Sequence, residues 1–60
     1  MKGYELIKEF YKADETGHKQ KYTHICGIVD NEQSRDEWLA KMTPFNTLYE
    51  HYGYHTIKEL

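Results

Sequence analysis

The sequence predicts a single small α+β domain, residues 1–60, in which one helix packs on one face of a small antiparallel sheet. Three observations support this fold class. A glycine-containing turn segment separates two stretches with strand composition, a helix-capping pattern precedes a short apolar segment, and the last seven residues alternate between apolar and polar. A chain of 60 residues is one domain at most, and it contains no repeat or low-complexity segment.

The first segment, 3–12, fits both a strand and a helix. Its apolar side chains form a helical stripe, which is the cleaner pattern, but the residues after it favour a strand. Ala13 to Gly17 has the composition of a hairpin turn, and Lys21 to Val29 is rich in β-branched and aromatic residues. Two strands joined by a short loop with a glycine are a common hairpin, so we predict a β-hairpin here.

The second strand of this hairpin, 22–29, carries apolar side chains on both of its faces. This pattern indicates either a central strand or a strand that uses one face for association. Gly27 indicates a bulge or a close backbone approach within it.

A helix is predicted at about 35–42. Ser34 stands in the N-cap position, and Glu37, three residues on, completes a capping box. Trp38 is then expected to face the core. Pro44 follows, and because the residue before a proline is disfavoured in the helical conformation, the helix is expected to break here.

Two conformations remain open for 44–51. The spacing of its apolar residues fits a helix, whereas its weak helix formers fit a strand that reaches a turn at Tyr52-Gly53. A C-terminal strand is predicted at about 54–60, at the edge of the sheet. The expected core consists of Leu6, Phe10, Ile25, Trp38, Leu39, Phe45, Leu48 and Ile57.

Composition narrows the environment of the protein. Cys26 is the only cysteine, which excludes an internal disulfide and fits a reducing compartment. The N-terminus has no apolar stretch of the signal-peptide kind, and no apolar run approaches the roughly 20 residues of a membrane span. We therefore expect a cytoplasmic protein with no membrane partner. Its size and mixed sequence are typical of accessory proteins of phages and mobile elements.

A zinc-stabilised module is one alternative function. Two candidate ligands share a strand face in His24-x-Cys26, and two share a helical face if His51-x3-His55 is helical. The paired-cysteine spacing of zinc modules is absent, and Gly53 interrupts the second pair. The favoured interpretation therefore has no metal and no other cofactor.

A small nucleic-acid-binding protein is a second alternative. Lysines flank the predicted hairpin with tyrosines among them, which suits phosphate contacts and base stacking. Carboxylates lie in the same segment, and the net charge of the whole chain is -2. A basic excess typical of nucleic-acid binders is missing.

A protein interface is the leading hypothesis. Six tyrosines in 60 residues exceed what so small an interior can hold, and exposed tyrosine is enriched at binding interfaces. No phosphate-binding loop or catalytic triad is visible, so we expect a non-enzymatic module that binds a larger host protein, as an inhibitor or modulator, and forms a dimer through a sheet edge or an aromatic face. The residues predicted to bind the partner are Tyr49, Tyr52, Tyr54, His55, Tyr11 and Tyr22.

Overall fold

The computed structural model describes residues 2–59, which form three strands, one α-helix and a 3₁₀ turn. The elements are β1 (Gly3–Ala13), β2 (Lys19–Val29), α1 (Glu32–Met42), the 3₁₀ turn η1 (Thr43–Phe45) and β3 (Glu50–Ile57). The strands form one antiparallel sheet in the order β2-β1-β3. The predicted α+β class and the hairpin are confirmed, and 3–12 is a strand. Of the two interpretations of 22–29, the central position is wrong, because β1 lies at the centre of the sheet and β2 at an edge.

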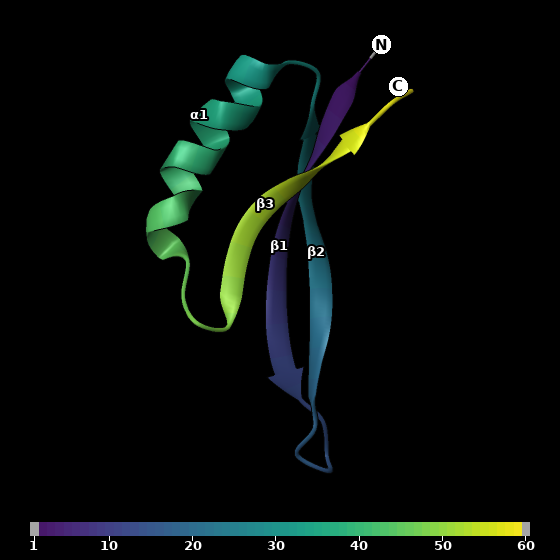
Figure 1. The fold of residues 1–60 in the computed structure, drawn as a ribbon, viewed down its shortest axis with the longest axis vertical. Coiled ribbons are helices and arrows are strands. Elements are labelled where there is room, and N and C mark those ends of the chain that lie inside the picture. Colours follow the sequence, from purple (N-terminus) through teal and green to yellow (C-terminus); the bar gives the residue numbers. More distant parts are fainter. Residues whose placement is uncertain (1, 60) are drawn as a thin grey trace.

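The molecule has two layers, the sheet and α1 (Figure 1). Its Cα atoms span 43 × 26 × 11 Å. In Figure 1 the three strands lie side by side in the half of the sheet near the hairpin loop and cross in the view near the chain ends, because the sheet twists, and α1 lies on the β3 side. Helix packing on one face of the sheet is confirmed. The described residues place no second layer on the opposite face.

The hairpin loop is organised by Asp14. One carboxylate oxygen of Asp14 accepts hydrogen bonds from the backbone N–H groups of Thr16 at 2.9 Å and His18 at 3.0 Å, and from the Thr16 hydroxyl at 2.6 Å. Gly17 has a φ of 87°, a conformation that L-residues with side chains rarely adopt. A short polar loop with an aspartate and a glycine thus reverses the chain between β1 and β2.

The helix begins earlier than the predicted 35–42. Its N-cap is Asn31, whose side-chain oxygen accepts a hydrogen bond from the Ser34 N–H at 2.7 Å. The predicted cap at Ser34 is wrong, because this serine already lies inside α1. Asparagine is as good an N-cap as serine, and the one that comes first in the chain takes the role.

The C-terminal strand also begins earlier than the predicted 54–60. Residues 44–51 form neither of the two regular alternatives, because η1 and a loop precede β3, which starts at Glu50. Side-chain hydrogen bonds shape this entry: Asn46 accepts from the Tyr52 N–H at 2.9 Å, and the Thr47 hydroxyl accepts from the Glu50 N–H at 3.1 Å. The predicted turn at Tyr52-Gly53 is wrong, since both residues lie within β3. The predicted end of this strand at residue 60 falls outside the described residues.

The buried core is small. Among the residues that the structure describes, the buried side chains are those of Tyr4, Leu6 and Ile7, all in β1, and the neighbouring Gly3 is buried as well. Of the expected core, Leu6 is confirmed and Phe10, Trp38, Leu39 and Ile57 are half-buried. The expectation is wrong for Ile25, Phe45 and Leu48, which are exposed. Ile25 lies on the sheet face opposite α1, and Phe45 and Leu48 lie outside the sheet, in η1 and in the loop before β3.

Within residues 2–59, no helix has both the length and the apolar composition needed to cross a membrane.

Candidate binding surface

The strand register determines which side chains share a face of the sheet. Residues paired across neighbouring strands point to the same side, and side chains alternate along each strand. Leu6 pairs with Gly27 and Tyr54, and this row faces α1, because the guanidinium of Arg35 in α1 lies 4.6 Å from the Tyr54 ring. We call this side the covered face and the opposite side the uncovered face.

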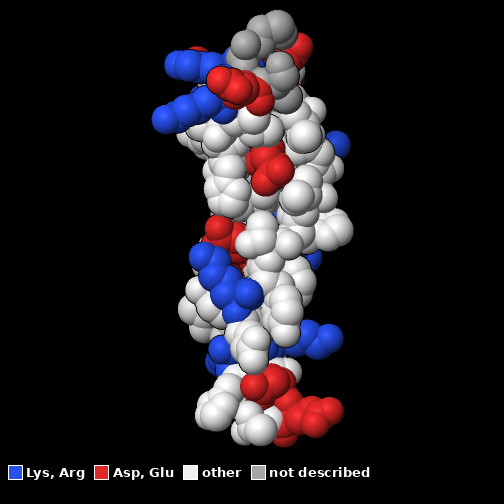
Figure 2. Space-filling model, turned by 90° about the vertical axis from the view of Figure 1, so that its right-hand side faces the viewer, with Lys and Arg blue, Asp and Glu red and all other residues white. Residues whose placement is uncertain are grey.

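The uncovered face carries an aliphatic centre. Ile7 of β1 pairs with Ile25 of β2, and the next row toward the chain ends joins Ile28 to Glu5. Ile25 and Ile28 remain 56% and 57% exposed, although Ile7 between them is buried by its neighbours. Figure 2 shows the side of the molecule away from α1: uncharged side chains cover much of it, and acidic and basic groups lie at both ends and also between them.

The charged groups of the uncovered face are largely paired within the chain. Lys21 Nζ lies 2.9 Å from a Glu9 carboxylate oxygen, and His55 Nδ1 lies 3.6 Å from a Glu5 carboxylate oxygen. The Glu9 carboxylate raises the pKa of Lys21. A partner docking on this face therefore meets isoleucines flanked by the Lys21–Glu9 ion pair and by the contact of His55 with Glu5.

The covered face is mainly aromatic. The Arg35 guanidinium lies 4.7 Å from the Tyr4 ring and 4.6 Å from the Tyr54 ring, and these two rings meet edge to face at 5.6 Å. Trp38 meets Tyr52 edge to face at 5.7 Å. Burial raises the pKa of Tyr4, and the nearby Glu32 carboxylate adds to the effect. Aromatic and cation–π contacts thus attach α1 to the sheet.

The six residues predicted to bind a partner are split by this geometry. Tyr52 and Tyr54 lie on the covered face under α1, where they pack against Trp38 and Arg35. Tyr52 is half-buried by these contacts, whereas Tyr54 remains 40% exposed, and neither residue lies at a turn tip, because both belong to β3.

The other predicted residues remain accessible. Tyr11 and His55 belong to the uncovered face by register, and the Tyr11 N–H donates to the Tyr49 carbonyl at 3.0 Å. Tyr22 shares the side of the sheet that carries α1, and its ring stacks on Phe10 at 5.6 Å. Tyr11, Tyr22, Tyr49 and His55 are all exposed. Three of these four thus surround or adjoin the uncovered face.

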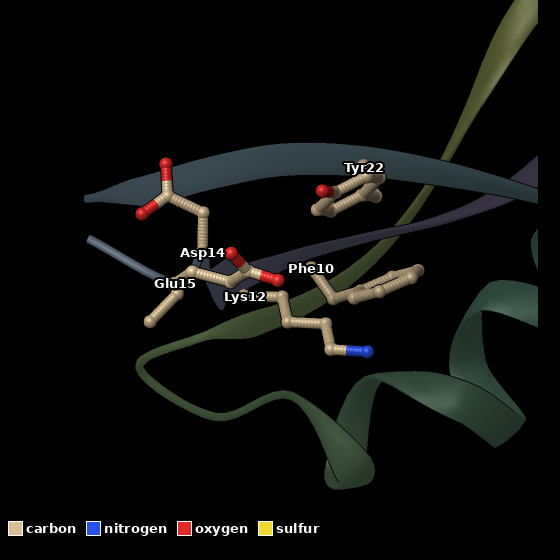
Figure 3. Close-up of a pocket in the computed structure, with 6 residues that line it drawn as sticks. Phe10, Lys12, Asp14, Glu15 and Tyr22 are labelled. Carbon is tan, nitrogen blue, oxygen red and sulfur yellow. The ribbon is translucent and has the colours of Figure 1, made fainter. Parts of the chain in front are cut away.

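A shallow hollow of about 420 Å³ lies beside the stacked rings (Figure 3). Phe10, Lys12 and Tyr22 line one part of it, and Asp14 and Glu15 of the hairpin loop line the rest. Figure 3 shows the Phe10 and Tyr22 rings lying over each other, with Lys12 extending beside Phe10. The hollow is open and has both charges at its border, so it lacks the convergent polar groups of a small-molecule site.

The alternative metal ligands do not converge. His51 and His55 lie on β3, whereas His24 and Cys26 lie on β2, and β1 separates the two strands. Residues 2–59 contain no group of three or more histidine, cysteine, aspartate or glutamate residues that could hold a metal ion. The helical spacing considered for His51 and His55 does not apply, because both lie in a strand.

Ile25 and Ile28 are the surface residues that sequence reasoning missed. Ile25 was expected in the core, and Ile28 was not singled out. The signal was present in the apolar character of both faces of 22–29, which fits a strand that uses one face for association. No family model, curated protein or solved structure matches the chain.

Proposed function

We propose that this chain is a small non-enzymatic module that binds a larger protein through the uncovered face of its sheet and thereby inhibits or modulates it. The observation that carries the proposal is the exposure of Ile25 and Ile28, each more than half accessible, at the aliphatic centre of a sheet face without a covering layer. Contiguous exposed apolar surface of this kind marks interaction sites in folded proteins.

The chemistry of the face favours a protein over a nucleic acid. Glu5 and Glu9 lie on the central strand of the face, where they would oppose phosphate groups. Burying apolar area contributes about 25 cal/mol per Å², and the paired charges limit the desolvation that accompanies docking. The partner we infer presents a flat apolar surface with a polar border, and Tyr11, Tyr49 and His55 of this chain would contact that border.

A capture experiment with matched variants tests the proposal. Tagged wild-type protein, Ile28→Lys and Leu48→Lys would be used to capture partners from nuclease-treated bacterial lysate. Leu48 is a suitable control, because it is 79% exposed and lies in the loop before β3. We expect one stoichiometric protein with wild type and with Leu48→Lys, and its loss with Ile28→Lys. Equal capture of the protein by Ile28→Lys would contradict the proposal. A parallel capture from untreated lysate that recovers nucleic acid and no protein would contradict it as well.

A further inference from the structure

The two edges of the sheet differ in how their backbone groups are satisfied. At the outer edge of β3, the Tyr52 N–H donates to Asn46 Oδ1 at 2.9 Å, and the Glu50 carbonyl accepts from the Thr47 N–H at 2.8 Å. The Glu50 N–H also donates to the Thr47 hydroxyl. The loop before β3 therefore closes the first half of this edge.

The outer edge of β2 is open. The Asp14 N–H donates to the His18 carbonyl at 2.8 Å. This hydrogen bond shows that the backbone groups of His18, and of every second residue after it in β2, point toward β1. Since backbone groups in an antiparallel pair alternate between inward and outward, every second residue from Lys19 to Ile25 directs its N–H and C=O away from β1. No hydrogen bond from residues 2–59 satisfies these outward groups.

The lysines of β2 do not shield this edge. Lysine side chains on an edge strand usually prevent pairing with another chain. Here Lys21 Nζ lies 2.9 Å from the Glu9 carboxylate on β1, and Lys19 Nζ lies 4.4 Å from the centre of the Tyr49 ring, beyond β1. Both ammonium groups thus lean inward over their own sheet, and the backbone at the edge stays accessible.

We propose that β2 pairs antiparallel with β2 of a second copy of this chain, about a two-fold axis at Tyr22, to form a continuous six-stranded sheet. The axis position follows from the bulge. The β1–β2 register shifts between Leu6 and Ile7 and leaves Cys26 without a partner, so the regular part of β2 ends at Ile25. The midpoint of the regular segment 19–25 is Tyr22.

The side chains are compatible with this pairing. In this register Tyr22 meets its own copy in a narrow, non-hydrogen-bonded pair, and each Tyr22 ring already stacks on Phe10. A row of four rings results, and cross-strand aromatic pairs stabilise sheets. Lys21 falls opposite Thr23, and Lys19 falls opposite Ile25, so no like charges face each other.

The dimer uses an edge of the sheet, whereas the proposed function uses a face, so the two proposals stand on different observations. Pairing in this register forms about eight backbone hydrogen bonds, two for each of four hydrogen-bonded residue pairs. It also extends the uncovered face across the two-fold axis. Residues 2–59 bury only the side chains of Tyr4, Leu6 and Ile7, and a second copy adds stability, because domains of this size are marginal alone.

Sedimentation analysis tests the assembly. We expect wild type to sediment as a dimer at about 100 µM chain, above the micromolar constants common for modest interfaces. Thr23→Pro removes an outward N–H and leaves the ladder to β1 intact, so this variant should be monomeric with an unchanged circular dichroism spectrum. Thr23→Val keeps the N–H and should remain dimeric. A monomeric wild type, or a dimeric Thr23→Pro, overturns the proposal.

Disulfide trapping tests the register without relying on Thr23→Pro to fold. The narrow pair has a Cα separation of about 4.5 Å, within the range that a disulfide bridges. In a Cys26→Ser background, Tyr22→Cys should form a covalent dimer under mild oxidation. Gln20→Cys is the matched control, because position 20 faces His24 of the other copy, and it should stay largely uncrosslinked. Equal crosslinking of both variants, or crosslinking of Gln20→Cys alone, contradicts the axis at Tyr22.

Discussion

The two faces of this sheet are built from alternate residues of the same strands, yet they differ in chemistry and in exposure. The covered face holds Tyr4, Tyr52 and Tyr54, and α1 adds Trp38 and Arg35 to it. The uncovered face is centred on isoleucines that remain more than half exposed. The difference indicates that the aromatic rings serve mainly to attach the helix, while the aliphatic face is left available for another molecule.

The largest expected effect on stability compares one substitution on each face of the sheet. Leu6→Ala removes a buried side chain of the covered face and should lower the free energy of unfolding by about 2–4 kcal/mol. Ile28→Ala, on the uncovered face, should lower it by less than about 1 kcal/mol, because its side chain is already 57% exposed. Urea unfolding followed by circular dichroism measures both. Similar losses for the two variants would show that the faces do not differ in this way.

The contribution of the helix to the covered face can be tested at Arg35. Arg35→Ala removes a guanidinium that lies over two tyrosine rings and should reduce the free energy of unfolding by about 1–2 kcal/mol. Arg35→Met keeps an apolar side chain against the rings and should lose less. Thermal and urea unfolding of both variants provide the measurement. If methionine costs as much as alanine, the charge over the rings is the main stabilising feature.

A smaller effect is expected where the helix begins. Asn31→Ala removes the side-chain oxygen that caps α1 and should cost about 1 kcal/mol. Ser34→Ala, at the position that sequence alone suggests as the cap, should change stability by only a few tenths of a kcal/mol. Urea unfolding of the two variants, compared by their midpoints, measures both effects. A larger loss at Ser34 than at Asn31 would contradict the observed cap.

The smallest effect is expected at the hairpin loop, away from both faces, and it depends on pH. Hydrogen bonds from Thr16, and further ones from His18 and Gln20, hold the pKa of Asp14 below its ordinary value of 3.8. Because the folded state has the lower pKa, the carboxylate stabilises the hairpin above about pH 4, and this contribution is lost as the pH falls through the folded pKa. The melting-temperature difference between wild type and Asp14→Ala should therefore shrink from pH 7 to pH 2. A difference that stays constant would contradict this.

Much of the fold follows from local signals in the sequence. The Asp14–Gly17 loop identifies the hairpin, and β-branched residues identify β2. Element boundaries follow less well, because Asn31 and Ser34 are both good caps, and only the folded chain shows which side-chain oxygen accepts the hydrogen bond from the first turn of the helix. The start of β3 depends on hydrogen bonds from Asn46 and Thr47, which no periodicity predicts.

The candidate surface was only partly predictable. Tyrosine content led to Tyr52 and Tyr54, but which face of a strand receives a helix is a tertiary property. Trp38 and Arg35 of α1 contact these two rings, and Tyr54 still remains 40% exposed. Ile25 and Ile28 have the composition of core residues, and their exposure depends on the absence of a second layer over residues 2–59. Hydrophobic pattern alone does not distinguish a buried face from an exposed one.

The most direct test of the two-face account measures stability and partner capture on the same pair of variants. The free energy of unfolding of Ile28→Lys should lie within about 1 kcal/mol of the wild-type value, and this variant should no longer capture the partner protein. Trp38→Phe, which keeps an aromatic ring between α1 and Tyr52 of the sheet, should lower the urea midpoint and still capture that protein while it is folded. Loss of stability in Ile28→Lys comparable to that in Trp38→Phe, or retention of the partner by Ile28→Lys, would contradict the account.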